Sequence, residues 1–374
     1  MRDLLGLGSD LPAWSGAVSA LLGRQVTVRA ADLDADLDAG RRTDGGKAHG
    51  MTRSVRLVVD DGGRVRRAFL KTPCEGLYGE ALAADAVREL AWRLEGYPWF
   101  AGHARCAAVG RMTPDGLVRV DQALEQATDP PWVLEWAEPG TPYARRLSGL
   151  ATIGPAAAAA EARLICVAMV ALHRPVQGNA SALYRRAVRD ALIGPAHRLI
   201  DSADAFWSGR IGLRLEVERA CARWRVLLAD RHDRLRYVHH DFHPWNVLYL
   251  PETGDVRLIG ARLPGVGDPY DDVAAFAVNY LWFGHARSGR VEGAYAAGFA
   301  AFRRTYLELT EGAATEPELM SPFLAKRLLV LLNPAYYPDM PEATAAWLED
   351  LLRRCLDDGV DLLRGEFGET EAGT

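Results

Sequence analysis

The sequence predicts an α+β fold with a strand-rich amino-terminal part and a larger, mostly helical carboxyl-terminal part. Apolar residues alternate on both sides of Asp60-Asp61-Gly62-Gly63, which indicates a β-hairpin because Asp-Gly supplies the positive φ angles of a tight turn. Apolar residues at helical spacing recur over 81–94 and through most of the chain after 155. A length of 374 residues is typical of about two domains or lobes.

The amino-terminal part, 1–137, is expected to be a small antiparallel sheet with one long helix. The long helix is predicted at 81–94, where its apolar side can pack on the hairpin. The other predicted elements are a helix at 4–22, a strand from Val26, a solvated turn at 31–40, hairpin strands at 55–59 and 65–70, strand and loop at 99–109 and 117–123, and a last strand at 132–136. Pro139-Gly140 then marks a boundary.

The carboxyl-terminal part, 138–374, is expected to consist mainly of amphipathic helices. These helices are predicted at 155–172, 181–200, 204–230 and 273–282, with further helices to the end of the chain interrupted at Asn333-Pro334 and Pro338. Between them, 237–272 contains two short strand-like runs, Val247 to Leu250 and Val256 to Ile259, joined by a Pro-Glu-Thr-Gly turn. This segment therefore interrupts the helical pattern with strand, loop and hairpin.

Charge and cysteine content restrict the compartment and the partners. A net charge of −5 and a pI near 6.0 argue against a nucleic-acid surface as the main function. The five cysteines are scattered without a C-x-x-C pair, which favours buried thiols in a reducing compartment. No run approaches the roughly 18 apolar residues of a membrane span, and the amino terminus lacks the apolar core of a signal peptide. We therefore expect a cytoplasmic protein that binds neither nucleic acid nor membrane.

Three polar residues in 237–272 form the pattern H-x-D-x-x-x-x-N, namely His239, Asp241 and Asn246. This is the spacing of the protein-kinase catalytic loop, where the Asp acts on the hydroxyl that receives the phosphoryl group and the Asn binds a metal ion. The chemistry needs both side chains on one rigid loop, because the hydroxyl proton needs an acceptor and Mg²⁺ needs oxygen ligands nearby. The pattern predicts a phosphoryl-transfer site.

Two longer blocks around this pattern resemble the aminoglycoside phosphotransferase and choline kinase-like family. The first reads His239-His240-Asp241-Phe242-His243-Pro244-Trp245-Asn246-Val247-Leu248 against the family's H-G-D-x-H-P-x-N-I-L, and the second reads Gly267-Asp268-Pro269-Tyr270-Asp271-Asp272-Val273-Ala274 against G-D-P-x-x-D-L-A. The resemblance implies a bilobal protein kinase-like fold, with ATP and Mg²⁺ as cofactors. It also implies that Asp241 is the base, that His239 braces the loop and that Asn246 binds the metal. His173, at the end of a predicted helix, is expected to be a structural histidine that bonds the catalytic loop.

Lysine usage points to a nucleotide-binding residue. Of the 44 basic residues, only Lys47, Lys71 and Lys326 are lysines. Lys71 ends a hairpin strand, where its compact ammonium could reach nucleotide phosphates as the kinase strand lysine does. An ordinary edge-strand lysine is the alternative. By resemblance, Glu89 on the predicted long helix is the best match for the acid that pairs with Lys71, ahead of Glu80.

Two further segments are expected to contact the nucleotide. Gly45, Gly46 and Lys47 belong to a glycine-containing loop, and glycines allow a backbone to approach phosphates closely, although similar loops also serve as plain hairpin turns. The strand that includes Leu134 and Trp136 is expected to be the hinge between lobes, where backbone groups hold adenine between apolar walls.

One position departs from the family pattern. Where the family carries its second metal-binding Asp, this chain reads Leu258-Ile259-Gly260-Ala261. Glycine provides neither a ligand atom nor a charge, so the implied Mg²⁺ site lacks one oxygen ligand. Asp255, Asp268 and Asp271 lie nearby in the sequence, which does not show whether any of them substitutes.

The sequence leaves three functions open. The first is ATP-dependent phosphoryl transfer to a hydroxyl of a small molecule or of a peptide Ser or Thr, in a biosynthetic or modification pathway; members of the family are associated with ribosomal-peptide pathways. The second, favoured by Gly260, is a catalytically impaired kinase-like protein, or pseudokinase, that binds nucleotide, a peptide or a partner enzyme. The third takes His239, Asp241 and His243 as an iron site of two histidines and one carboxylate, and leaves Asn246 unexplained.

Acidic side chains in the carboxyl-terminal helices concern the acceptor. In the family the acceptor lies among such helices, and clustered carboxylates would suit a polycationic aminoglycoside. The acidic residues are Glu308, Glu311, Glu316, Glu318, Asp339, Glu342, Glu349 and Asp350. Because arginines are interspersed among them, we expect a solvated face of mixed charge instead.

Overall fold

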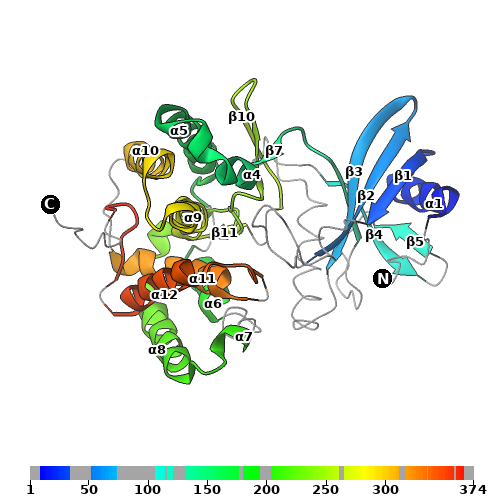
Figure 1. Cartoon of the computed structure of the whole chain (residues 1–374). Coiled ribbons are helices and arrows are strands. Elements are labelled where there is room, and N and C mark those ends of the chain that lie inside the picture. Colours follow the sequence, from blue (N-terminus) through cyan, green and yellow to red (C-terminus); the bar gives the residue numbers. More distant parts are fainter. Residues whose placement is uncertain are drawn as a thin grey trace. The chain divides into compact units, whose positions relative to one another are not determined.

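A computed structural model of the chain describes residues 9–33, 52–73, 106–113, 116–120, 132–176, 180–193, 204–260, 265–310, 317–334, 336–357 and 359–365. The chain divides into two compact units. Unit 1 contains Met1–Thr43 and Lys47–Pro139, and unit 2 contains Asp44–Gly46 and Gly140–Thr374. Unit 1 is built on an antiparallel sheet and unit 2 is mainly helical, so the α+β class predicted from the sequence is confirmed (Figure 1).

The described part of unit 1 forms a six-stranded antiparallel sheet in the order β1-β2-β3-β6-β4-β5. Its strands are β1 (Thr27–Leu33), β2 (Thr52–Asp61), β3 (Arg64–Pro73), β4 (Cys106–Thr113), β5 (Gly116–Arg119) and β6 (Trp132–Trp136). The β2–β3 hairpin lies where it was predicted, and Asp60 Oδ1 accepts a hydrogen bond from the Gly63 amide at 2.8 Å in its turn. The turn predicted from residue 31 was wrong for Ala31 to Leu33, because these residues pair with β2.

Helix α1 (Leu11–Leu22) packs on this sheet and fills its core. Asp10 caps the helix by accepting a hydrogen bond from the Ala13 amide at 3.0 Å. Trp14, Val18 and Leu21 are buried in one cluster with apolar residues of the sheet. Each such side chain contributes about 1.5–3 kcal/mol of transfer free energy, so α1 is a main source of stability for unit 1.

Unit 2 is built mainly from helices around one large core. The described helices are α4 (Tyr143–Ser148), α5 (Pro155–Leu172), α6 (Ala180–Ile193), α7 (Asp204–Trp207), α8 (Ile211–Leu228), α9 (Tyr270–Ser288), α10 (Gly293–Leu309), α11 (Pro317–Leu332) and α12 (Glu342–Asp357). Helix α9 is central, since it is buried from Tyr270 to Trp282 and contacts α10, α11 and α12. The single helix predicted at 204–230 is two helices, because Gly209 between α7 and α8 takes a φ of 74°.

Short strands interrupt these helices and carry the H-x-D loop. They are β7 (Thr141–Pro142), β8 (Arg236–Tyr237), β9 (Val247–Leu250), β10 (Asp255–Leu258) and β11 (Val266–Gly267). β9 forms a hairpin with β10 and also pairs with β7, while β8 pairs with β11. The loop between β8 and β9, residues 238–246, is called the catalytic loop below. The predicted order of strand, loop and hairpin is confirmed.

Helix α5 is the one helix among the described residues whose length and hydropathy would suit a membrane span. Ala162, Ile165 and Met169 on this helix are fully buried in the core of unit 2. Glu161 on the same helix is also buried, and it accepts hydrogen bonds from Arg146 at 2.6 and 3.0 Å. The apolar side of α5 is therefore engaged in packing within unit 2.

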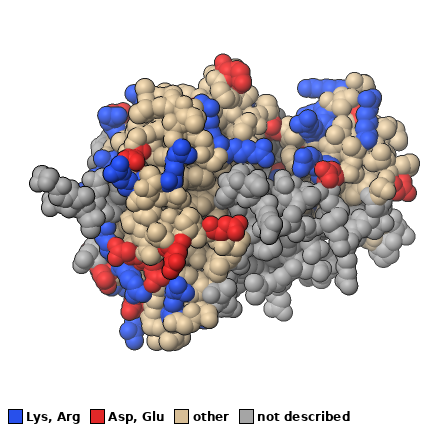
Figure 2. Space-filling model, in the orientation of Figure 1, with Lys and Arg blue, Asp and Glu red and all other residues tan. Residues whose placement is uncertain are grey.

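The surface of unit 2 carries charges of both signs (Figure 2). Glu349 on α12, one of the acidic residues considered for the acceptor, lies 2.9 Å from Arg353 and 3.2 Å from Arg210. Because these groups pair with one another in contact with solvent, this part of the surface agrees with the predicted face of mixed charge.

Candidate active site

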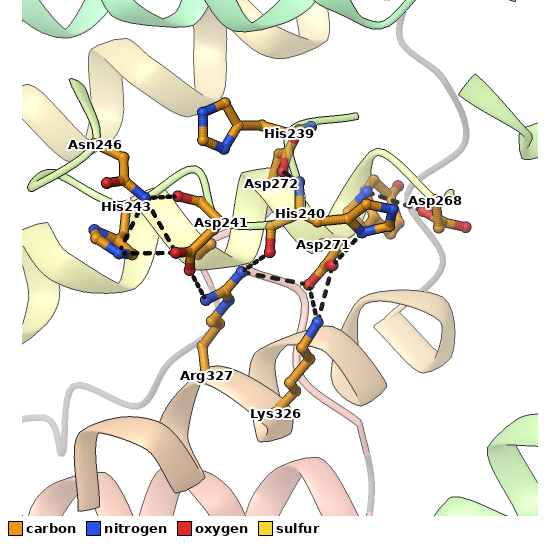
Figure 3. A network of polar contacts seen from close by, with 12 residues as sticks. His239, His240, Asp241, His243, Asn246, Asp268, Asp271, Asp272, Lys326 and Arg327 are labelled. Atoms are coloured by element: carbon orange, nitrogen blue, oxygen red, sulfur yellow. Dashed lines mark hydrogen bonds and ion pairs between the residues drawn. The ribbon is translucent and has the colours of Figure 1, made fainter. Parts of the chain in front are cut away.

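The catalytic loop places Asp241 beside Asn246 (Figure 3). Asn246 Nδ2 donates hydrogen bonds to the Asp241 backbone carbonyl at 2.9 Å and to Asp241 Oδ2 at 3.1 Å. The loop also turns on itself, since the Asn246 amide donates to the His243 carbonyl at 2.8 Å and His243 Nε2 lies 3.3 Å from Asp241 Oδ2. The structure therefore brings two of the predicted site residues together and adds His243 to them.

Asp272, in the first turn of α9, anchors the catalytic loop. Its carboxylate is fully buried and accepts hydrogen bonds from the backbone amides of His239 at 2.7 Å and His240 at 2.9 Å. His173 Nε2 lies 3.1 Å from the same carboxylate. His173 therefore bonds the catalytic loop through Asp272, as expected of a structural histidine.

His239 is a buried histidine with the geometry of a brace. Burial lowers the pKa of its ring to about 4, against the opposing effect of the Asp272 carboxylate, so the ring is neutral near pH 7. The ring packs edge-on against Phe242, with 5.7 Å between the ring centroids.

His240 stands where the family pattern has a glycine. Its φ of 63° is left-handed, and within the described residues it is the only non-glycine residue with a positive φ. Contacts of the ring offset this strain, because Nδ1 lies 3.1 Å from Asp271 Oδ2 and Nε2 lies 3.0 Å from the Val266 carbonyl oxygen. A Cβ on Gly267 would come within 2.7 Å of the ring, so Gly267 leaves the room that the ring occupies.

Helix α11 contributes two cations that were not predicted from the sequence. Lys326 Nζ lies 2.9 Å from both carboxylate oxygens of Asp271. Arg327 donates through Nη2 to the His240 carbonyl at 2.8 Å and through Nη1 to Asp241 Oδ1 at 3.3 Å. The scarcity of lysine was a signal for Lys326, but no local pattern indicates that α11 packs against the catalytic loop.

The residues of the catalytic loop do not fit the metal site that the family pattern implies. Gly260 takes a φ of 71°, and a Cβ there would lie 2.8 Å from Asn246 Oδ1. Asn246, the predicted metal ligand, therefore occupies the space that a carboxylate at residue 260 would need. Its Nδ2 group donates to Asp241, which leaves Oδ1 as the atom that could bind a metal ion. Across the described ranges, no group of three or more His, Cys, Asp or Glu side chains could hold a metal ion.

The three nearby aspartates are engaged elsewhere or exposed. Burial would raise the pKa of Asp271, but the Lys326 ammonium lowers it below its ordinary value. Asp268 is held by the Arg234 guanidinium at 2.7 and 2.8 Å. Asp255 is exposed at the start of β10. None of the three thus replaces a carboxylate at residue 260.

The iron site considered from His239, Asp241 and His243 is not formed. His243 Nε2 and Asp241 Oδ2 are 3.3 Å apart, but the His239 ring faces Phe242. Among the described residues, these three side chains do not form a group that could hold a metal ion. This hypothesis was wrong because residues that alternate in sequence share a face only in an extended segment, and the catalytic loop is turned.

In unit 1, Lys71 on β3 pairs with Glu135 on the neighbouring strand β6. Lys71 Nζ lies 2.6 Å from Glu135 Oε2, and the Glu135 side chain is only 3% exposed. The two residues occupy diagonal positions in the β3–β6 pairing, which sets this contact. A charged residue inside the apolar run Trp132–Trp136 was a sequence signal for it. Glu89, the predicted partner, lies outside the described residues.

The remaining predicted nucleotide-binding residues have different surroundings. Gly45, Gly46 and Lys47 lie outside the described residues. Leu134 is fully buried in the core beneath α1. The Trp136 ring lies 3.9 Å below the Arg66 guanidinium carbon. These two side chains are therefore engaged within unit 1.

Aromatic rings support the catalytic loop next to Asn246. The Trp245 ring stacks on Trp282 of α9, with 6.0 Å between centroids, and tilts against Phe283 at 6.1 Å and Tyr337 at 6.3 Å. Aromatic rings in such contact stabilise a loop through the apolar area that they bury and through the preferred geometry of the ring pairs. The loop is thus fixed by packing on one side of Asn246 and by ionic contacts at Asp241.

A scan of protein-family models and a search of curated proteins gave no match to this chain. A search of solved structures gave matches to phosphotransferases. An aminoglycoside phosphotransferase from Streptomyces rimosus is 16% identical, with a TM-score of 0.44 over 74% of this chain and 89% of that one. A putative fructosamine-3-kinase from Haemophilus somnus is 12% identical, with a TM-score of 0.48 over 95% of this chain and 100% of that one. An ethanolamine kinase from Plasmodium vivax is 8% identical, with a TM-score of 0.46 over 81% of this chain and 79% of that one.

Proposed function

We propose that the chain is a phosphotransferase that transfers a phosphoryl group from ATP to a hydroxyl. The observation that carries the proposal is the contact between Asp241 and Asn246, on a loop whose backbone is fixed by the buried Asp272 carboxylate. A carboxylate preformed on a rigid loop suits this reaction, because catalysis of phosphoryl transfer depends mostly on positioning and charge.

Each described residue has a defined role in this proposal. Asp241 orients the acceptor hydroxyl and takes its proton as the new O–P bond forms and the bond to the departing ADP breaks. Its side chain is 13% exposed, so an acceptor can reach it. Lys71, held by Glu135, binds the phosphates of ATP. Asn246 holds the Asp241 carboxylate, and no step is assigned to a metal ion.

The acceptor is a small molecule or a peptide Ser or Thr. Two carboxylates next to the loop are already engaged, because Lys326 pairs with Asp271 and the buried Asp272 accepts hydrogen bonds from loop amides. A polycationic acceptor would need additional negative charge, so we favour a neutral hydroxyl compound over an aminoglycoside. The buried free thiols of the described residues are compatible with a reaction in the cytoplasm.

A second candidate is a kinase-like protein with impaired catalysis that binds nucleotide, a peptide or a partner enzyme. The observation that favours it is the side chain of Asn246 in the place of a carboxylate at residue 260. The contact between Arg327 and Asp241 points the same way, because an ion-paired carboxylate accepts a proton less readily.

The two candidates differ in turnover. We would incubate the whole protein with ATP labelled in the γ-phosphate and with a panel of neutral alcohols, Ser/Thr peptides and aminoglycosides, and would follow both transfer and release of phosphate to water. The matched variant is Asp241→Asn, which keeps the shape of the side chain and removes its charge. ATP binding would be measured by calorimetry for both proteins.

A phosphotransferase predicts labelled product or phosphate release from the wild-type protein and a loss of about 100-fold or more in Asp241→Asn, with ATP affinity retained. Equal turnover in Asp241→Asn would refute the role of Asp241. ATP binding without any turnover on the whole panel, water included, would support the second candidate.

A further inference from the structure

Arg327 is the side chain that connects α11 to the proposed base. Its guanidinium contacts the catalytic loop twice, at the His240 carbonyl oxygen at 2.8 Å and at Asp241 Oδ1 at 3.3 Å. It also lies 3.7 Å from Asp271 Oδ1 at the start of α9. One buried cation therefore joins the backbone of the loop, the carboxylate of Asp241 and the helix behind them (Figure 3).

The Arg327 guanidinium is buried and keeps its positive charge. Arg327 is 7% exposed. Burial alone would lower the pKa of its guanidinium, but the Asp271 and Asp241 carboxylates raise it above the ordinary value, so the positive charge is retained. Loss of either partner of a buried ion pair leaves the other charge uncompensated, which destabilises the protein.

The family pattern implies a metal ion beside the Asn of the catalytic loop. There the Asn of the loop and an Asp at residue 260 would hold Mg²⁺, and this ion would tie the loop to the hairpin that follows. In this chain residue 260 is a glycine at a φ of 71°, and a Cβ there would lie 2.8 Å from Asn246 Oδ1, so a side chain would require Asn246 to shift. The Asn246 side chain donates through Nδ2 to Asp241 Oδ2 at 3.1 Å. Arg327 holds the other carboxylate oxygen of the same residue.

We propose that Arg327 is a positioning residue for Asp241, and that its fixed charge holds the catalytic loop in the absence of a divalent metal ion. The loop is then preformed in the absence of metal. Arg327 takes no part in bond making. It fixes the direction of the Asp241 carboxylate, while Lys326 fixes Asp271 and, through it, the His240 ring. The kinetic part of this inference rests on the proposed function; the structural part does not.

Hydrogen exchange of the whole protein tests the structural part without any ligand. We would measure exchange by mass spectrometry in peptides covering 236–250, in buffer with Mg²⁺ and in buffer with EDTA. The wild-type loop is expected to exchange equally in the two buffers. In Arg327→Gln the loop amides are expected to exchange about tenfold faster, because the loop opens locally, while peptides of α5 and α10 remain unchanged.

Two variants accompany this measurement. Arg290→Gln removes an exposed arginine that pairs with Glu292, and it is expected to behave as the wild type. Arg327→Lys retains the charge without the planar fork, and it is expected to restore part of the protection of the loop. If Arg327→Gln does not fold, the comparison between Arg327→Lys and the wild type still tests the proposal.

Unchanged loop exchange in Arg327→Gln would overturn the positioning role, as would unchanged exchange in Arg327→Lys if the Gln variant is unfolded. Faster exchange of the wild-type loop in EDTA would overturn the claim that the loop is held without a metal ion. A kinetic arm uses hydrolysis of ATP by water as its probe. There Arg327→Gln is expected to lower kcat about tenfold or more with an unchanged KM for ATP, since only the direction of Asp241 is lost. A protein that neither hydrolyses ATP nor transfers phosphate to any compound of the panel would contradict the proposed function and would leave the exchange result to decide the role of Arg327.

Discussion

Two Asp–Arg pairs of unit 2, Asp268 with Arg234 and Asp241 with Arg327, differ in character. Asp268 is 2% exposed and receives four short hydrogen bonds, two from Arg234 at 2.7 and 2.8 Å, one from the Tyr184 hydroxyl at 2.6 Å and one from the Tyr270 amide at 2.9 Å. Asp241 is more exposed, and its carboxylate contacts with Arg327, Asn246 and His243 measure 3.1 to 3.3 Å.

This difference distinguishes an ion pair that only stabilises the fold, at Asp268, from a carboxylate that can still bind an acceptor hydroxyl, at Asp241. The Arg234 fork grips both oxygens of Asp268, the arrangement that gives the strongest charge-assisted hydrogen bonds. No acceptor could compete for a carboxylate held in this way. Asp241 is oriented by longer contacts from several directions, so it can give up one of them when a hydroxyl arrives. The predictions below test this contrast.

The largest effect is expected from breaking the clamp. Arg234→Ala leaves the Asp268 charge buried without its main partner and is expected to lower the free energy of unfolding by about 3–5 kcal/mol. Asp241→Asn is expected to cost less than half as much, because Arg327 keeps the His240 carbonyl and Asp271. Urea unfolding followed by circular dichroism compares the two variants. A loss for Asp241→Asn as large as that for Arg234→Ala would show that both pairs are clamps.

The second effect is a loss of stability in acid caused by His239. Its pKa is lowered to about 4 in the folded protein, whereas the unfolded chain takes up the proton near the ordinary value of 6.5. Stability from this group is therefore complete above about pH 6.5 and is lost as the pH falls toward 4, by about 3 kcal/mol in total.

Unfolding of wild type and His239→Gln between pH 4 and pH 8 measures this effect. The variant is expected to be less stable at pH 8 and to show a shallower fall in stability with acid. Parallel pH curves for the two proteins would contradict the assignment of His239 as a buried neutral brace.

The third effect concerns the space at Gly260. Gly260→Ala and Gly289→Ala both place a side chain at a left-handed φ, 71° and 74° respectively, which costs about 1–2 kcal/mol. Only at residue 260 does the new Cβ meet an atom within 3 Å, Asn246 Oδ1. Gly260→Ala is therefore expected to cost more than Gly289→Ala and to increase hydrogen exchange in the catalytic loop. Equal costs would mean that Asn246 can move aside, and the metal site could then be restored by a carboxylate.

The smallest effect sets the baseline for all of these. Arg290 and Glu292 form a pair at 2.7 Å, but their side chains are 75% and 47% exposed. Arg290→Gln is expected to change the free energy of unfolding by less than about 0.5 kcal/mol, because water already solvates both charges. A larger change in urea unfolding would mean that exposed ion pairs also contribute to stability. The differences in exposure and distance between Asp268 and Asp241 would then not predict their effects on stability.

Local patterns predicted much of the fold. The Asp-Gly turn fixed the β2–β3 hairpin, and helical spacing located α5, α6 and the helices after residue 270. The loop that carries both Asp241 and Asn246, and the hairpin after it, were also predicted, since these features depend on neighbours in the sequence. Two predictions about the fold were wrong. Gly209 ends a helix that was predicted to continue, and Ala31 to Leu33 form a strand because they pair with β2.

Contacts between distant segments could not be predicted in the same way. Arg327 is separated from Asp241 by 86 positions, and Glu135 from Lys71 by 64. Helical spacing says which side of α11 is apolar but not which loop it packs against. The absence of a carboxylate at residue 260 was visible in the sequence, but only the structure shows the Asn246 side chain in its place.

Calorimetric titration of ATP into the whole protein in Mg²⁺ buffer, with Lys71→Ala as the matched variant, tests the central claim most directly. The account predicts saturable binding of one ATP per chain, weakened about tenfold or more in the variant because Lys71 holds the phosphates. No binding to the wild-type protein, or equal affinity in Lys71→Ala, would contradict a phosphotransferase built on Lys71 and Asp241.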